Sequence, residues 1–238
     1  MNELEVTPPS AFTATAAGTA ERVTAFLRKV YGWMFVGLGI TATVALGMAS
    51  SPALMQILMQ NKFLFFGLMI GELGLVFYLS ARVEKIAPAT ASGLFLLYSA
   101  LNGVTLSLIF LAYTGTSIAS TFAVTAGMFG ALALYGTTTK RSLAGVGQFM
   151  FMGVIGLVLA SVVGMFVKSD GLQFVISVVG VLVFAGLTAY DAQRLKAMAL
   201  AVPEGRIGSY AVVGALALYL DFINLFLFLL RFLGGRRD

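Results

Sequence analysis

Long apolar runs alternate with short polar and basic segments along almost the whole chain after residue 30. A helix that crosses the roughly 30 Å hydrocarbon core of a bilayer needs about 20 apolar residues. Seven runs meet that requirement and predict membrane-spanning helices over residues 31–49, 63–81, 89–112, 117–137, 147–167, 172–197 and 208–231. The pattern therefore predicts an all-α membrane protein, with a single seven-helix transmembrane domain over residues 26–234.

The two ends of the chain lack such runs. Residues 1–25 start with a Thr-, Ala- and Pro-rich stretch that has neither a basic start nor an apolar core. We expect these residues to form a mobile cytoplasmic tail rather than a signal peptide. Residues 235–238 are expected to form a short basic tail.

Composition supports the membrane class and narrows the chemistry. Hydrophobic residues make up 59% of the 238-residue chain and charged residues only 11%, whereas soluble domains carry about 25% charge. The sequence has 0 His and 0 Cys, which excludes His- or Cys-based zinc sites, thiol nucleophiles, disulfides and Ser-His-Asp triads. We expect no cofactor and no enzymatic activity.

The basic residues indicate how the chain is oriented. Ten of them, from Arg22 to Arg206, fall on one side of the predicted spans, and only Lys62 and Lys168 fall on the other. The positive-inside rule then places the N-terminus in the cytoplasm of a multi-pass inner membrane protein. With seven spans, the basic C-terminal end falls on the opposite side. Either this end is an exception to the rule or the last apolar segment is re-entrant. The length of that segment favours seven complete spans. Basic residues at span ends do not predict nucleic-acid binding.

Three carboxylates fall inside predicted spans: Glu72, Asp191 and Asp221. A charged group in hydrocarbon is costly unless it is protonated, paired or facing water, so such residues are candidates for function. Asn224 lies three residues after Asp221 and therefore on nearly the same helix face, where it is a candidate to support the acidic pair.

Register predicts that the two aspartates meet. Asp191 and Asp221 are equally distant in sequence from residue 206, which lies in the expected loop between the last two spans. The carboxyls should then share one proton and titrate in two steps, the upper between roughly pH 6 and 8. The alternative is a buried pair with a purely structural role.

Two arginines are candidate counter-ions for this pair. Arg82 ends the second span and can approach from a different helix, as a latch held when the pair is ionised and released when it is protonated. Arg194 lies three residues after Asp191, where a local pair is worth a few tenths of a kcal/mol. Arg82 alternatively only marks a membrane boundary.

Small residues recur at a four-residue period in the fifth span, where they occupy one helix face. We expect Gly156, Ala160 and Gly164 to mediate close helix packing.

Several stretches together resemble the Bax inhibitor-1 (transmembrane Bax inhibitor motif) family, in its bacterial branch. They are FLRKVYGWMFVGLGIT at 26–41, ELGLVFYLSARVEK at 72–85, LYSALNGVTLSLIF at 97–110, TFAVTAGMFGALALYGTTTKRSL at 121–143, VLVFAGLTAYDAQRLKAM at 181–198 and ALYLDFINLFLFLLRFLG at 217–234. These stretches cover nearly everything after residue 25 and occur in the family's order.

The resemblance implies a seven-helix fold whose last helix is surrounded by the other six, and a pH-sensitive calcium leak across the membrane. It assigns the pH sensor to Asp191 and Asp221 and the gate to Arg82, and Glu72 fits an acidic residue on the second helix with a role in permeation. Calcium prefers about six to eight oxygen ligands, so we expect only transient binding at the two aspartates, as conduction requires.

Three other functions compete with the channel. An intramembrane aspartyl protease would carry Gly-x-Gly before its second aspartate, where this chain has Leu218-Tyr219-Leu220. A proton-coupled transporter is also possible, because acidic pairs serve as proton relays. However, this sequence shows no obvious inverted repeats with broken helices, which alternating access would use. The main alternative is a non-channel regulator that binds a membrane-bound ATP-dependent protease, as some bacterial relatives are thought to do, with residues 1–20 as the candidate arm.

Overall fold

The computed structural model describes residues 10–167 and 169–235, and every regular element within them is a helix. In chain order these are α1 (Ser10–Ala49), α2 (Pro52–Gln60), α3 (Lys62–Arg82), α4 (Pro88–Leu106), α5 (Ile109–Ala112), α6 (Gly115–Thr138), α7 (Ala144–Phe166), α8 (Asp170–Ala201), the 3₁₀ turn η1 (Glu204–Arg206) and α9 (Ile207–Leu233). Seven helical segments in this part of the chain are long and apolar enough to cross a membrane. The predicted all-α fold with seven spans is confirmed.

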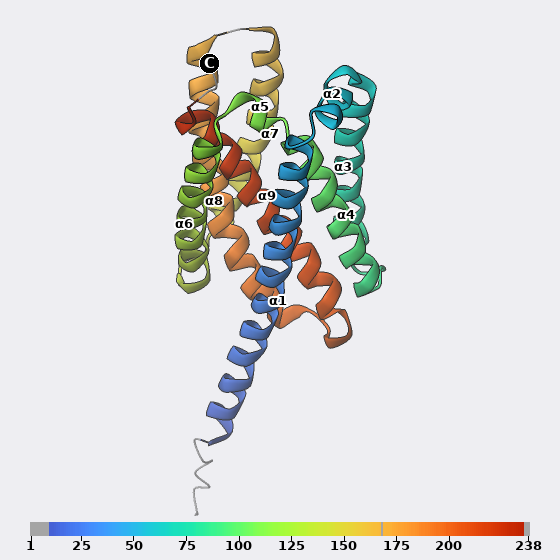
Figure 1. Cartoon of the computed structure of the whole chain (residues 1–238). Coiled ribbons are helices and arrows are strands. Elements are labelled where there is room, and N and C mark those ends of the chain that lie inside the picture. The colour runs from blue at the N-terminus through green and yellow to red at the C-terminus, as the bar shows by residue number, and fades with distance from the viewer. Residues whose placement is uncertain (1–9, 168, 236–238) are drawn as a thin grey trace, which may run out of the picture.

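The last helix, α9, runs through the interior of the bundle (Figure 1). It packs against α1, α3, α4, α6 and α8, whereas α7 packs mainly against α8. Of the most apolar stretch of α9, 67% is buried, compared with 6% for α3. The prediction of a central last helix therefore agrees with the structure, although α7 lies outside its main contacts.

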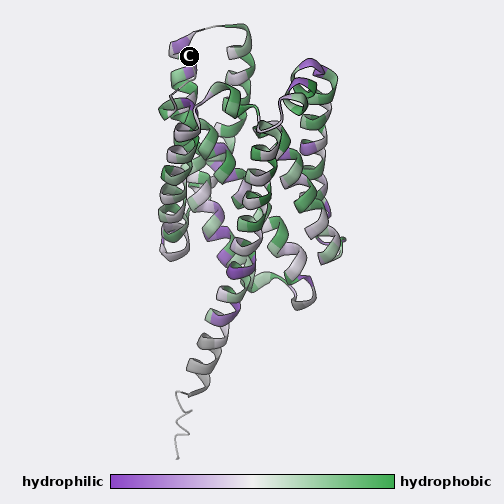
Figure 2. Cartoon of the chain, in the orientation of Figure 1, coloured by the Kyte–Doolittle hydropathy of each residue, from purple (hydrophilic) through white to green (hydrophobic). Residues whose placement is uncertain are grey.

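The outer helices expose apolar side chains, as a bilayer requires. Phe63 and Phe77 on α3 are 93% and 71% exposed, and Figure 2 shows hydrophobic residues over most of the bundle, with hydrophilic ones mainly toward helix ends. Lipid tails solvate such side chains as well as protein does, so helix association depends on close packing and polar contacts. The positions that provide them are the glycines and buried polar groups described below.

The first helix starts earlier than the predicted span, because α1 begins at Ser10 and residues 10–25 of the expected tail are helical. Residues 13–25 include several alanines, the strongest helix former, and the segment ends at Phe26, which is 2% exposed. The start of α1 projects beyond the other helices (Figure 1). Residues 1–9 of the predicted tail, Lys168 and residues 236–238 of the basic tail lie outside the described residues.

Arg22 ties this extension to the loop between α8 and α9. Its Nε donates a hydrogen bond to the Ala199 carbonyl oxygen at 3.0 Å, and the guanidinium also donates to the Val202 carbonyl oxygen. These are carbonyls at the C-terminal end of α8, which have no partner within the helix. A cation at this end also interacts favourably with the helix dipole.

We expect Arg22→Ala to loosen the end of α8, at a cost of about 1 kcal/mol. Hydrogen exchange of the backbone amides over residues 199–206 should accelerate, whereas Arg28→Ala, at an exposed arginine further along α1, should leave exchange there unchanged. Equal exchange in the two variants would contradict this docking role.

Two local features depart from the predicted spans. The predicted helix over 89–112 is interrupted at Ser107, whose Oγ donates to the Val104 carbonyl oxygen at 2.6 Å and competes with the backbone ladder. The chain then continues as the single turn α5. Between α1 and α3, the short helix α2 begins at Pro52 and buries Met55 and Leu58; proline is favoured at the first turn of a helix.

Candidate functional site

Asp221 lies near the middle of α9 and is only 5% exposed. Among the described residues its buried Oδ2 atom has no hydrogen-bond partner. Asn224 does not supply one, because its Nδ2 donates to the carbonyl oxygen of Leu220 in its own helix at 2.8 Å. An unpaired carboxylate oxygen in a low-dielectric interior is costly, so Asp221 is suited to hold a proton or to bind a cation.

Asp191 lies on α8 and faces the same cavity as Asp221. The two carboxyl groups are close enough to interact electrostatically. Arg194, one helical turn further along α8, also lines the cavity and interacts with Asp191. The structure therefore brings both predicted aspartates and one of the two predicted arginines into one site, which we call the dyad cavity.

The dyad cavity has a volume of about 990 Å³ and lies between α7, α8 and α9. Its lining on α7 extends from Ala144 to Met165, which at 1.5 Å per residue is about 32 Å. Its lining on α8, from Phe184 to Arg194, and on α9, from Ala217 to Phe228, is shorter, at about 15–17 Å. The cavity is mostly apolar, and its polar lining residues include Gln148, Ser161 and Asn224 together with the charged groups.

Gln193 holds α8 in place beside the dyad, a role that sequence reasoning missed. Its Oε1 accepts a hydrogen bond from the Leu143 amide at 2.8 Å, and its Nε2 donates to the Arg141 carbonyl oxygen at 2.8 Å. The connection between α6 and α7 is thereby fastened two residues after Asp191. Gly147 contributes similarly, since a side chain there would overlap the ring of Tyr190.

Arg82 is not part of the dyad cavity. It is exposed at the end of α3, and α3 packs mainly on α4, with a smaller contact to α9. In this structure Arg194, rather than Arg82, is therefore placed to act as the counter-ion of the aspartates.

Glu72 belongs to a second polar cluster, away from the dyad. Its Oε2 accepts a hydrogen bond from Asn102 Nδ2 at 3.2 Å, and its Oε1 accepts one from Thr105 Oγ1 at 3.0 Å. Both donors lie on α4, which explains how α3 carries a carboxylate at membrane depth. Glu72, for which the resemblance implied a role in permeation, does not line the dyad cavity.

The cluster continues into the centre of the bundle. Tyr219, which is fully buried on α9, donates from its hydroxyl to Asn102 Oδ1 at 2.9 Å and lies 2.6 Å from Thr41 Oγ1 on α1. We call the chain of Glu72, Asn102, Tyr219 and Thr41 the polar relay. It joins four helices, and because Tyr219 and Asp221 are two residues apart, α9 presents the relay and the dyad on opposite faces.

The oxygen atoms that line the dyad cavity are few for a calcium site. In the described part of the chain, no three acidic side chains lie close enough together to hold a metal ion. The dyad cavity offers two carboxylates and the neutral oxygens of Asn224, Gln148 and Ser161, compared with the six to eight oxygen ligands that calcium takes.

Fold and site together define a multi-pass membrane protein whose central helix carries buried Asp221 of the dyad on one face and Tyr219 of the polar relay on the other. The family model described as inhibitor of apoptosis-promoting Bax1 matches residues 23–238. This chain therefore belongs to the Bax inhibitor-1 family, as the resemblance predicted.

Relatives match over nearly the whole chain. The inner membrane protein YbhL of Escherichia coli K12 is 53% identical over 215 residues, covering 89% of this chain and 92% of YbhL. A protein of Borreliella burgdorferi is 46% identical over 215 residues, which covers 90% of this chain and 93% of the relative. A Deinococcus radiodurans protein is 43% identical over 225 residues, with coverage of 94% and 96%.

Proposed function

We propose that this protein is a pH-gated calcium leak channel of the inner membrane, with the N-terminus in the cytoplasm. The observation that carries the proposal is the dyad cavity, which lies between the membrane-spanning helices α7, α8 and α9 and contains Asp191, Asp221 and Arg194. Carboxylates within a hydrophobic constriction attract cations while binding them weakly enough to release them. The identity of YbhL as an inner membrane protein supports the location.

Gating follows from the charge balance in the cavity. When both aspartates are ionised, their negative charge holds Arg194 beside them and the guanidinium obstructs the cation path. A proton taken up by either aspartate reduces this attraction, because two carboxylates in a low-dielectric site do not both stay charged cheaply. Arg194 is then released, so calcium flux should rise as pH falls.

The test is calcium flux into proteoliposomes between about pH 5 and 9, a range that brackets titration of buried carboxylates. Wild type should show flux that increases toward acidic pH. Asp191→Asn and Asp221→Asn mimic the protonated forms, so each should give high flux with little pH dependence. Asp170→Asn is the matched control, since Asp170 is exposed at the start of the same helix as Asp191 and its variant should follow wild type.

The arginine variants decide which residue is the counter-ion. Arg194→Gln should raise flux at alkaline pH, whereas Arg82→Gln should leave it unchanged. The opposite result would restore Arg82 as the latch. No flux above empty liposomes at any pH, with folded protein, would overturn the channel and leave the regulator of a membrane-bound protease as the alternative.

A further inference from the structure

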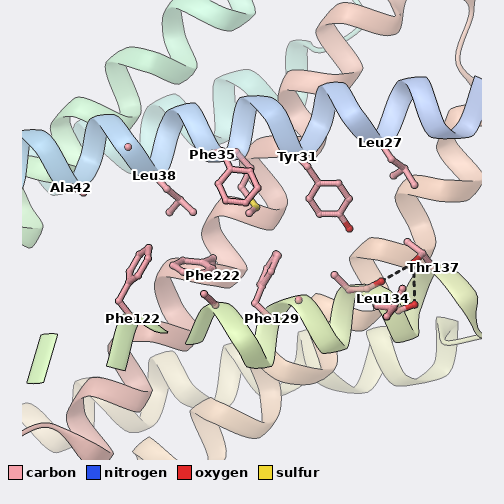
Figure 3. Close-up of a pocket in the computed structure, with 15 residues that line it drawn as sticks. Leu27, Tyr31, Phe35, Leu38, Ala42, Phe122, Phe129, Leu134, Thr137 and Phe222 are labelled. Carbon is pink, nitrogen blue, oxygen red and sulfur yellow. Dashed lines mark hydrogen bonds between the residues drawn. The ribbon is translucent and has the colours of Figure 1, made fainter. Parts of the chain in front are cut away.

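A groove separates α1 from α6 on the membrane-facing side of the bundle. Neither helix packs closely on the other; α6 contacts α8 and α9, while α1 contacts α4, α8 and α9. The groove encloses a cavity of about 640 Å³, lined by Tyr31, Phe35 and Leu38 on α1, Phe129 and Leu134 on α6, and Phe222 of α9 at its floor. In Figure 3 the side chains of α1 and α6 face each other across this space.

The groove is long, apolar and continuous. A second cavity of about 420 Å³ adjoins the first and shares Leu38, Ala42 and Phe122 with it. Together they follow α1 from Leu27 to Leu46, which is about 28 Å at helical rise. Two side chains at the rim, Phe35 and Leu134, are 68% and 65% exposed, so the groove opens toward the hydrocarbon of the bilayer.

One end of the groove is polar and basic. The hydroxyl of Tyr31 points toward α6 near Thr137 (Figure 3). Lys196 lies at the same end, where its Nζ donates to the carbonyl oxygen of Thr137 at 2.9 Å. Arg28 follows the lining residue Leu27, and Lys140 follows Thr137 by three residues; both are exposed. Cationic side chains at the membrane surface attract anionic headgroups.

From this combination we infer that the groove between α1 and α6 binds one anionic phospholipid, with an acyl chain along Phe35, Leu38 and Phe222 and its phosphate at the end that carries Lys196 and Arg28. In the hydrocarbon region, lipid is the ligand available to an apolar cavity that opens sideways. The basic residues select the charge of the headgroup. This site is independent of the dyad cavity and of calcium conduction.

Two glycines allow the groove to be filled with little strain. Gly39 and Gly130 line it, and a Cβ added at either position meets no atom within 4 Å. Leucine at these sites would occupy the space of the acyl chain, and it is also a stronger helix former than glycine. Gly67 on α3 and Gly156 on α7 are matched controls, since a Cβ there also meets open space and neither lines the groove.

The test measures lipid retained by the purified full-length protein, using native mass spectrometry after release from vesicles of phosphatidylglycerol and phosphatidylcholine. Wild type should retain one phosphatidylglycerol in preference to phosphatidylcholine. Gly39→Leu and Gly130→Leu should each reduce its affinity about tenfold, which corresponds to roughly 1.4 kcal/mol. Gly67→Leu and Gly156→Leu should bind like wild type.

A second set of variants examines the headgroup without altering the groove. Lys196→Gln and Arg28→Gln should weaken phosphatidylglycerol binding and leave phosphatidylcholine binding unchanged, whereas Lys85→Gln, in the connection between α3 and α4, should have no effect. Unchanged retention in both groove variants would overturn the site. Equal retention of the two lipids by wild type would overturn its charge selectivity. If wild type is instead a dimer without bound lipid, and the groove variants Gly39→Leu and Gly130→Leu are monomers, the groove is occupied by a second copy of the chain and the lipid site is overturned.

Discussion

Gly136→Val should destabilise the protein by about 3 kcal/mol, because overpacking a contact that cannot move aside typically costs this much. A Cβ at Gly136 would overlap the backbone carbonyl of Ala189 on α8. Backbone atoms have no rotamer with which to avoid the clash, so α6 and α8 would have to separate. Ala189 lies two residues before Asp191, and the separation would therefore also displace the dyad.

The measurement is the free energy of unfolding of detergent-solubilised protein. Gly127→Val is the matched control on the same helix, since a Cβ at Gly127 meets no atom within 4 Å, and its effect should stay within about 0.5 kcal/mol. If the two variants are equally stable, α6 and α8 do not approach each other as closely as the structure shows.

The seven spans were predictable because membrane helices carry their signal in composition alone. The second span was predicted over 63–81 and is observed as Lys62–Arg82; the last was predicted over 208–231 and is observed as Ile207–Leu233. Hydropathy does not detect a change of backbone geometry inside an apolar run, so the interruption at Ser107 escaped prediction. The extension of α1 escaped for the opposite reason, because its residues are helix-forming without being apolar.

The dyad was partly predictable because α8 and α9 are consecutive helices, and a hairpin places residues equidistant from its centre at similar depth. The contribution of α7 to the dyad cavity was not predictable, since α7 packs mainly on α8 and reaches the neighbourhood of α9 through it. The lining on α7 includes Gln148, a neutral residue that no charge-based search would select. The sequence favoured Arg82 over Arg194 as the gate, whereas the structure places Arg194 in the dyad cavity, because the choice depends on where α3 stands in the bundle.

Small residues illustrate the same limit. The face of Gly156, Ala160 and Gly164 was predicted to mediate close packing. Gly164 does so, since it is buried and a Cβ there would lie 2.8 Å from Gln173 Nε2, whereas a Cβ at Gly156 would meet open space and the residue is exposed. A regular period shows that small residues share a face without showing which neighbour that face meets. The close approach at Gly136 comes from a single glycine, which leaves no pattern in the sequence.

The polar relay makes the second large prediction. Asn102→Leu should destabilise the protein by about 3 kcal/mol, since it removes one donor from Glu72 and the acceptor of the Tyr219 hydroxyl at the same time. Asn224→Leu provides a matched control, because within residues 10–167 and 169–235 the Asn224 amide bonds only to the carbonyl oxygen of Leu220 in its own helix. Its cost should be about 1 kcal/mol.

A double-mutant cycle separates the relay from simple loss of packing. Removing one partner of a buried polar contact leaves the other unsatisfied, whereas removing both does not. The combined variant Glu72→Leu with Asn102→Leu should therefore be more stable than the sum of the two single effects predicts, by about 1–3 kcal/mol. Tyr219→Phe should likewise cost less in the Asn102→Leu background than in wild type. Strict additivity of these free energies would show that the four side chains act as independent contacts, and that α9 is not joined to α3 and α1 through them.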